Sequence, residues 1–241
     1  MPLVKLLARQ RPDIDDPAAA IAAMAVRVDG AIVTNPGANV RPDASIVVRV
    51  DQAPRGIEKL GHALDRLGLT AAVAGAVCLD VGACTGGFTR ALLDRGAARV
   101  YAVDVGHGQL LGSLRADARV VNLERTNVAD LDDVLVPDAL DLVVVDVSKL
   151  PLGKAVEQMT ERVRLRAGAE LVGLVKPMFE LRLGELPTSA EQLAEAGDRA
   201  VGAIEAAGWT VRALIESEVR GNRGAVELFV HAAFSGPTVR A

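Results

Sequence analysis

From residue 76 to the end of the chain, short aliphatic runs alternate with helix-like segments, and this alternation is the strongest constraint on the fold. Strands that alternate with helices are typical of a parallel sheet covered on both faces. We therefore predict an α/β, doubly wound, Rossmann-like sheet that binds its ligand at the carboxyl ends of the strands. The predicted strands are 76–81, 99–105, 120–123, 140–145 and 170–175, and the helices between and after them are 88–95, 109–115, 152–165 and 191–207.

The last two predicted strands, 209–216 and 226–234, have no helix between them, so we expect a C-terminal antiparallel hairpin at the sheet edge. Half of the 241 residues are hydrophobic, but the chain holds one Trp, one Tyr and four Phe. The core must therefore be built from aliphatic side chains, which suits buried parallel strands.

Residues 1–50 read as a separate small α+β module. Leu3, Leu6 and Leu7 recur at helical spacing, a helix over 18–25 follows Pro17, and Asp29-Gly30 predicts a tight hairpin turn. Residues 46–50 form a further predicted strand. Residues 51–75 read as a linker and a helix over 57–67 that Gly68 ends, which leaves 76–241 as the main domain.

Several classes of protein are disfavoured. Cys78 and Cys84 have no histidine at metal-ligand spacing, so we expect neither a metal site nor a disulfide framework. The charged N-terminus lacks a signal-peptide pattern, and the chain has no apolar run of membrane-spanning length. We expect a cytoplasmic protein with no membrane partner. The net charge of -4 argues mildly against a dedicated polyanion binder.

A glycine-rich loop after the first strand is the sharpest local motif. Residues 79–88 read LDVGACTGGF, in which Gly82 and Gly86 permit close approach of a ligand to the backbone. The spacing is not that of a dinucleotide-binding loop. Asp104 ends the next strand, where a carboxylate can accept hydrogen bonds from ribose hydroxyls, and Asp130 could meet an adenine amino group. Together these positions favour S-adenosylmethionine (SAM) as the cofactor.

The chain resembles the TlyA-type ribosomal RNA methyltransferases, a branch of the FtsJ-like ribose 2′-O-methyltransferases. The strings that carry the resemblance are RGIEKL at 55–60, DVGACTGGFT at 80–89, YAVDVGHGQL at 101–110 and LERTNV at 123–128, with weaker similarity in DVS at 146–148, VKPMFE at 175–180 and VELF at 226–229. The resemblance implies a SAM-dependent methyltransferase whose N-terminal module binds RNA and whose partner is a ribosomal subunit.

Two sets of candidate site residues follow. The glycine loop and the ends of the next two strands give the cofactor-binding set: Asp80, Gly82, Ala83, Thr85, Gly86, Gly87, Phe88, Asp104, Val105, Asn127 and Asp130. The resemblance implies the catalytic set, a Lys-Asp-Lys-Glu centre that maps onto Lys59, Asp146, Lys176 and Glu227.

The chemistry of ribose methylation gives these four groups a purpose. A ribose hydroxyl attacks well only as it loses its proton, so catalysis should come from positioning and proton removal. Lys176 is the best candidate base if its amine is neutral. A second cation such as Lys59 would favour the neutral amine, whereas the two carboxylates oppose it and orient both amines.

Some positions depart from the family pattern and keep alternatives open. Lys149 stands where the family has an aromatic residue, and the segment after Glu180 is less basic than usual. A SAM-dependent methyltransferase of the same fold that acts on a small molecule is therefore an alternative. A non-catalytic RNA- or membrane-binding protein is a third, since TlyA-type proteins have been linked to haemolysis. The intact cofactor loop and the lack of a basic amphipathic helix argue against it.

Overall fold

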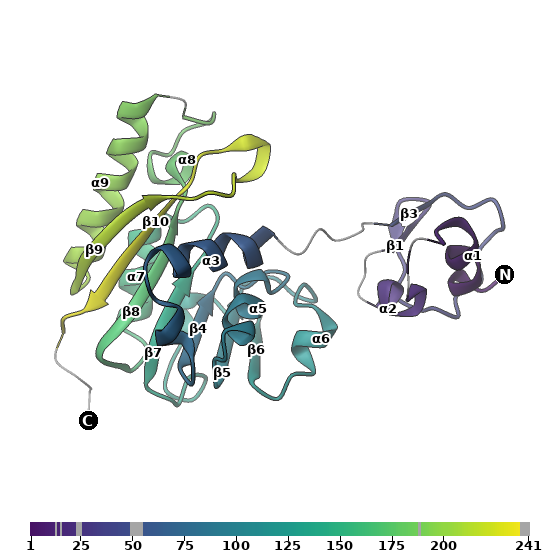
Figure 1. Ribbon diagram of the computed structural model, residues 1–241, viewed down its shortest axis with the longest axis horizontal. Coiled ribbons are helices and arrows are strands. Elements are labelled where there is room, and N and C mark those ends of the chain that lie inside the picture. Colours follow the sequence, from purple (N-terminus) through teal and green to yellow (C-terminus); the bar gives the residue numbers. More distant parts are fainter. Residues whose placement is uncertain (13, 15, 23–25, 49–54, 188, 237–241) are drawn as a thin grey trace. The chain divides into compact units, whose positions relative to one another are not determined.

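The computed structural model describes residues 1–12, 14, 16–22, 26–48, 55–187 and 189–236. The chain forms two compact units, residues 1–52 with 111–113, and residues 53–110 with 114–241. Figure 1 labels the elements of both.

The first unit packs two helices, α1 (Leu3–Gln10) and α2 (Pro17–Ala22), with a small antiparallel sheet of order β2-β1-β3. Its strands are β1 (Val26–Val28), β2 (Ala31–Ile32) and β3 (Ile46–Val48). The predicted hairpin is confirmed, because β1 pairs with β2 around Asp29 and Gly30, which both have positive φ. The predicted extensions of α2 to residue 25 and of β3 to residue 50 lie outside the described residues. Leu3, Leu6, Leu7, Ile21 and Val26 are among the buried residues of its core.

The second unit is built on a seven-stranded sheet of order β6-β5-β4-β7-β8-β10-β9. The pairs β5–β6, β4–β5, β4–β7 and β7–β8 are parallel, whereas β10 runs antiparallel to both β8 and β9. The predicted doubly wound sheet and its C-terminal hairpin are confirmed. The strands are β4 (Val77–Val81), β5 (Arg99–Asp104), β6 (Val120–Glu124), β7 (Leu140–Val145), β8 (Leu165–Val175), β9 (Trp209–Glu216) and β10 (Leu228–Phe234).

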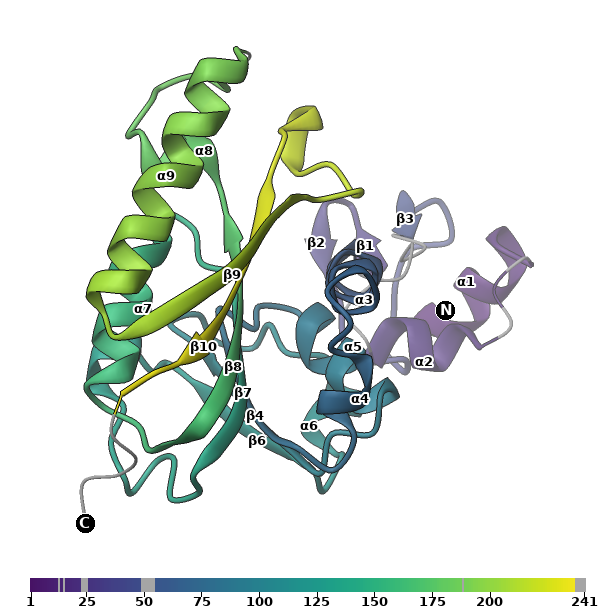
Figure 2. The ribbon, with the colours of Figure 1, turned by 60° about the vertical axis from the view of Figure 1, so that its left-hand side comes forward.

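Helices cover both faces of this sheet, as Figure 2 shows: α3 (Arg55–Arg66), α4 (Thr70–Val73) and α5 (Gly87–Asp94) lie on one face, and α7 (Leu152–Thr160) and α9 (Ala190–Ala206) lie on the other. Short elements complete the unit: α8 (Pro177–Glu180), η1 (Val128–Asp130) and η2 (Asn222–Gly224). The short helix α6 (Gly112–Arg115) begins in residues assigned to the first unit and ends in the second. The buried core is aliphatic, as the composition predicts, and includes Val143, Val145, Val175 and Val230. No described helix is long and apolar enough to span a bilayer.

Two predicted helices are shorter in the structure. The predicted helix over 109–115 begins only at Gly112, and the backbone N–H groups of Gln109 and Leu110, in the turn before it, donate to the Glu124 carboxylate. The predicted helix over 152–165 ends at Thr160, because Leu165 already pairs with Leu140 as the first residue of β8.

The parallel strands define two opposite edges of the sheet. The carboxyl ends of β4 to β8 form what we call the carboxyl edge, and their amino ends form the amino edge. Loops that leave the carboxyl edge carry the residues that the sequence singles out, which is the place where open α/β sheets bind ligands.

Candidate active site

The loop after β4 can pass close to β7 because residue 82 is glycine. Gly82 has φ +90°, and a Cβ atom there would collide with the backbone carbonyl of Asp146. Its N–H donates to the carbonyl of Val103 at 2.8 Å, so the loop is held between the ends of β5 and β7. Gly86, with φ +96°, then ends the loop and starts α5.

The Asp104 carboxylate lies at the end of β5 and braces this loop. Its Oδ2 accepts the Cys84 N–H at 2.8 Å, and its Oδ1 accepts the Gly106 N–H at 2.6 Å. Each carboxylate oxygen has a further lone pair available for a ligand hydroxyl. Asp104 is therefore fixed in orientation and still able to accept.

A cavity of about 500 Å³, which we call the large pocket, opens beside Asp104. This volume lies in the usual range for small-molecule and cofactor sites. Of the predicted cofactor-binding residues, Gly82, Asp104, Val105 and Asn127 line it; Asp80, Ala83, Thr85, Gly86, Gly87, Phe88 and Asp130 are not among its lining residues. The sequence reasoning missed other lining residues: Val81, Cys84, Val103, Thr126, Val128, Val147, Ser148, Lys149 and Leu150.

Several of the predicted cofactor-binding residues instead pack against neighbouring elements and hold the loop in place. Asp80 is fully buried and accepts the Thr89 hydroxyl at 2.6 Å. Burial raises the pKa of Asp80 to about 7. Phe88 stacks on Phe229 of β10, with ring centroids 6.2 Å apart. These contacts fix α5 and β10 against the end of β4.

The four predicted catalytic residues form two ion pairs at the carboxyl edge. Lys59 Nζ lies 2.6 Å from Glu227 Oε2, and both side chains are buried. Lys176 Nζ lies 2.5 Å from Asp146 Oδ1 and donates to the Ser148 hydroxyl at 3.2 Å. The first ion pair thus connects α3 to the segment before β10, and the second connects the end of β8 to the end of β7.

Small residues let these segments meet. Gly56 packs against Gly87, so α3 approaches α5 closely enough to bring Lys59, one turn later, over the sheet. Gly221 packs against the Glu227 carboxylate, and a Cβ atom there would displace it. Both contacts depend on the absence of a side chain.

A buried carboxylate links the two segments that carry Lys176 and Asp146. Glu180 ends α8, which starts directly after Lys176, and accepts the backbone N–H of Leu152 at the start of α7 at 2.5 Å. Burial raises the pKa of Glu180 above its usual range. No local sequence pattern predicts this role of Glu180, because its partner is 28 residues away in the chain.

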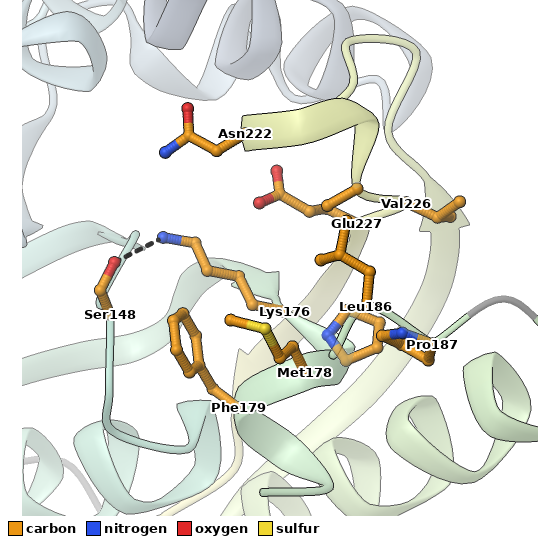
Figure 3. Close-up of a pocket in the computed structure, with 11 residues that line it drawn as sticks. Ser148, Lys176, Met178, Phe179, Leu186, Pro187, Asn222, Val226 and Glu227 are labelled. Carbon is orange, nitrogen blue, oxygen red and sulfur yellow. Dashed lines mark hydrogen bonds between the residues drawn. The ribbon is translucent and has the colours of Figure 1, made fainter. Parts of the chain in front are cut away.

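A second cavity of about 150 Å³, the small pocket, lies beside Lys176 and Glu227. Figure 3 shows both side chains facing this space, with Asn222 above and Met178 and Phe179 below. Ser148 lines both pockets, and the Lys176–Asp146 pair joins a residue of the small pocket to one of the large pocket. The site can therefore hold a nucleoside-sized ligand on one side and an acceptor hydroxyl near amines and carboxylates on the other. No cluster that could hold a metal ion occurs among the described residues.

Comparison with known proteins identifies the family. The FtsJ-like methyltransferase family matches residues 53–234. This chain belongs to the FtsJ-like methyltransferase family. The predicted resemblance is confirmed, and as an FtsJ-like methyltransferase the protein is a SAM-dependent enzyme.

Relatives match over most of the chain. The 16S/23S rRNA (cytidine-2′-O)-methyltransferase TlyA of Mycobacterium tuberculosis is 39% identical over 219 residues, which cover 87% of this chain and 80% of the relative. Hemolysin A of Brachyspira hyodysenteriae is 37% identical and covers 69% of each protein. A solved structure from Streptococcus thermophilus is 25% identical, covers 99% of this chain and 90% of that chain, and has a TM-score of 0.71.

Proposed function

We propose that this enzyme transfers a methyl group from SAM to a ribose 2′-hydroxyl of ribosomal RNA. The observation that carries the proposal is the pair of ion pairs, Lys59–Glu227 and Lys176–Asp146, beside two pockets that share Ser148. The named activity of the mycobacterial relative, at 39% identity, supports the same reaction and points to cytidine as the nucleoside.

The large pocket is the proposed SAM site. Asp104 has the acceptor oxygens and the fixed orientation that a ribose diol requires. Val105, Val128 and Leu150 supply apolar lining of the kind that an adenine ring needs. SAM, when bound, supplies an activated methyl group on sulfur.

The small pocket is the proposed site of the acceptor ribose. Lys176, held by Asp146 and Ser148, orients the hydroxyl. A new bond forms between the hydroxyl oxygen and the methyl carbon, the carbon–sulfur bond breaks, and the hydroxyl proton is taken up by the Lys176–Asp146 pair. The Lys59–Glu227 pair lies in the wall of this pocket, where Glu227 is a lining residue.

Replacing the proposed base tests this assignment. Lys176→Met should lower kcat on the order of 100- to 10,000-fold while SAM binding, measured by calorimetry, is retained. The assay is methylation of ribosomal subunits with radiolabelled SAM, and resistance of the modified linkage to alkaline hydrolysis locates the methyl group on the 2′-oxygen.

The matched control is Arg166→Met, which removes a cation paired at 2.9 Å with Asp141 at the amino edge. It should methylate normally. Base methylation, or full activity in Lys176→Met, would contradict the proposal. Turnover of a small hydroxyl compound that salt does not affect, with no RNA product, would favour the small-molecule alternative.

A further inference from the structure

The second unit pairs its cations with carboxylates almost everywhere except around the proposed active site. In the part of this unit that the structure describes, the Lys and Arg side chains without an ion pair are Arg55, Arg125, Lys149, Arg162, Arg182 and Arg223. All of them except Arg162 lie at the carboxyl edge or at the start of α3. The unpaired positive charge is therefore concentrated on one side of the sheet.

Four of these cations come from different loops next to the pockets. Arg125 precedes Thr126, and Lys149 itself lines the large pocket. Arg182 and Arg223 follow Phe179 and Asn222, which line the small pocket. We call these four residues the cationic rim: Arg125, Lys149, Arg182 and Arg223. All four are exposed.

For each rim cation, the acidic residue nearest to it in the chain interacts with another group. Glu124 is paired with Arg115, and Asp146 with Lys176. Glu180 accepts the Leu152 N–H, and Glu227 is paired with Lys59. The rim charges are thus left for a ligand, although the chain has a net charge of -4.

The backbone of the rim gives a second, independent indication. Arg125, Lys149, Arg182 and Arg223 all have positive φ, between 54° and 67°. This conformation disfavours long side chains and normally selects glycine or asparagine. Strain of this kind concentrates at functional sites. A set of Arg and Lys residues at four such turns indicates that the side chains, not the turns, are needed there.

We infer that the cationic rim binds RNA phosphates on both sides of the methylated nucleotide, so that the methyltransferase unit holds its RNA itself. The inference rests on the proposed function, since it takes RNA as the substrate. Cations on separate loops around two pockets can contact successive phosphates of an RNA backbone that passes across both pockets. Such contacts supply affinity without reading the base sequence.

The test compares the salt dependence of RNA binding in full-length proteins. In the rim variant, Arg125, Lys149, Arg182 and Arg223 are all replaced by Gln. The slope of log K against log salt should become shallower by roughly 3, because each lost phosphate contact on single-stranded RNA removes about 0.7. Affinity should fall on the order of 1,000-fold at about 0.1 M salt and converge with the unmodified protein near 1 M. The probe is a fluorescein-labelled single-stranded RNA of mixed sequence.

Arg162→Gln is the matched control, because it removes an unpaired cation at the amino edge. It should leave the slope unchanged, and thermal melting should show both variants folded. If the rim variant keeps the slope of the unmodified protein while that protein methylates ribosomal RNA, the rim inference is wrong and the proposed function stands. If the unmodified protein methylates no RNA at all, the proposed function itself fails.

Discussion

The charged residues at the amino edge of the parallel sheet pair on the exposed surface, whereas the carboxyl edge buries one ion pair, partly buries a second and leaves other cations without a partner. At the amino edge, Arg99, Arg164 and Arg166 each meet an aspartate on the surface. Pairs of this kind contribute little to stability and are replaceable. At the carboxyl edge, charge is desolvated or strained, which costs stability and is retained where a site requires it. We therefore expect substitutions of charged residues to be tolerated at the amino edge and to be harmful at the carboxyl edge.

Two glycines with similar backbones on opposite edges should give the largest overall difference, because Gly82→Ala is expected to lose both SAM binding and stability. Gly82→Ala combines a φ of +90° with a collision against the Asp146 carbonyl, so we expect loss of SAM binding and a drop in unfolding free energy of about 3 kcal/mol or more. Gly75 precedes β4 at the amino edge with φ +75° and open space around a Cβ atom, so Gly75→Ala should lose only about 1 kcal/mol. Denaturant unfolding and SAM calorimetry measure both. Equal losses would show that the close approach of the loop to β7 is unimportant.

The buried Lys59–Glu227 pair should come next. Its side chains are 9% and 8% exposed, so Lys59→Met alone leaves an uncompensated buried carboxylate and should lower the unfolding free energy by about 3–5 kcal/mol. The double variant Lys59→Met/Glu227→Leu should recover most of that stability without recovering methylation. Arg166→Met, whose side chain is 59% exposed, should change stability by under about 1 kcal/mol. Additive losses in the double variant would mean that the pair is not coupled.

Two aspartates should give the edges opposite pH dependence. Asp80, below the cofactor loop, has its pKa raised to about 7 by burial, so the folded state holds a proton that the unfolded chain loses near pH 4. Its stabilising contribution is complete below about pH 4 and lost as pH rises through about 7. The melting temperature of the natural protein minus that of Asp80→Asn should therefore fall over this interval.

The amino edge supplies the comparison. Hydrogen bonds from Arg119 lower the pKa of Asp117 to about 2, so its contribution is present above about pH 4 and lost as pH falls through about 2. The difference between the natural protein and Asp117→Asn should shrink on acidification. If the difference in melting temperature between the natural protein and Asp80→Asn is the same at every pH, burial does not raise the pKa of Asp80 as described.

Local patterns in the sequence predict the secondary structure around the site but not the side-chain contacts within it. The strand, glycine loop and helix around Gly82 follow from side-chain types alone, and so do the hairpins. The meeting of Lys59 with Glu227, 168 residues apart, came from the family resemblance, because only the fold brings these segments together. By its pattern alone, Glu227 reads as a solvent-facing residue of an edge strand.

Adjacency to the loop proved a poor guide to side-chain direction. Phe88 follows the cofactor loop in sequence, yet α5 turns its ring toward Phe229 and away from the large pocket. Ser148 and Cys84 line that pocket but carry no pattern of their own, since their directions depend on the turns that follow β7 and β4. The predicted cofactor-binding set therefore overlaps the lining of the large pocket only in part, and its role in binding SAM stays a prediction.

Replacement of Lys149 should have the smallest effect on stability, and it tests directly why the carboxyl edge tolerates backbone strain. Lys149 has φ +67°, so replacement by glycine relieves about 1 kcal/mol of strain while increasing the freedom of the unfolded chain by a similar amount. Lys149→Gly should leave the melting temperature almost unchanged, and Lys149→Gln, which keeps the strain, should melt no higher. Both should weaken RNA binding alike and reduce the salt slope by about 0.7, because both remove one cation. If Lys149→Gly binds RNA as tightly as the natural protein, the charge at this turn has no part in binding, and its backbone strain needs another cause.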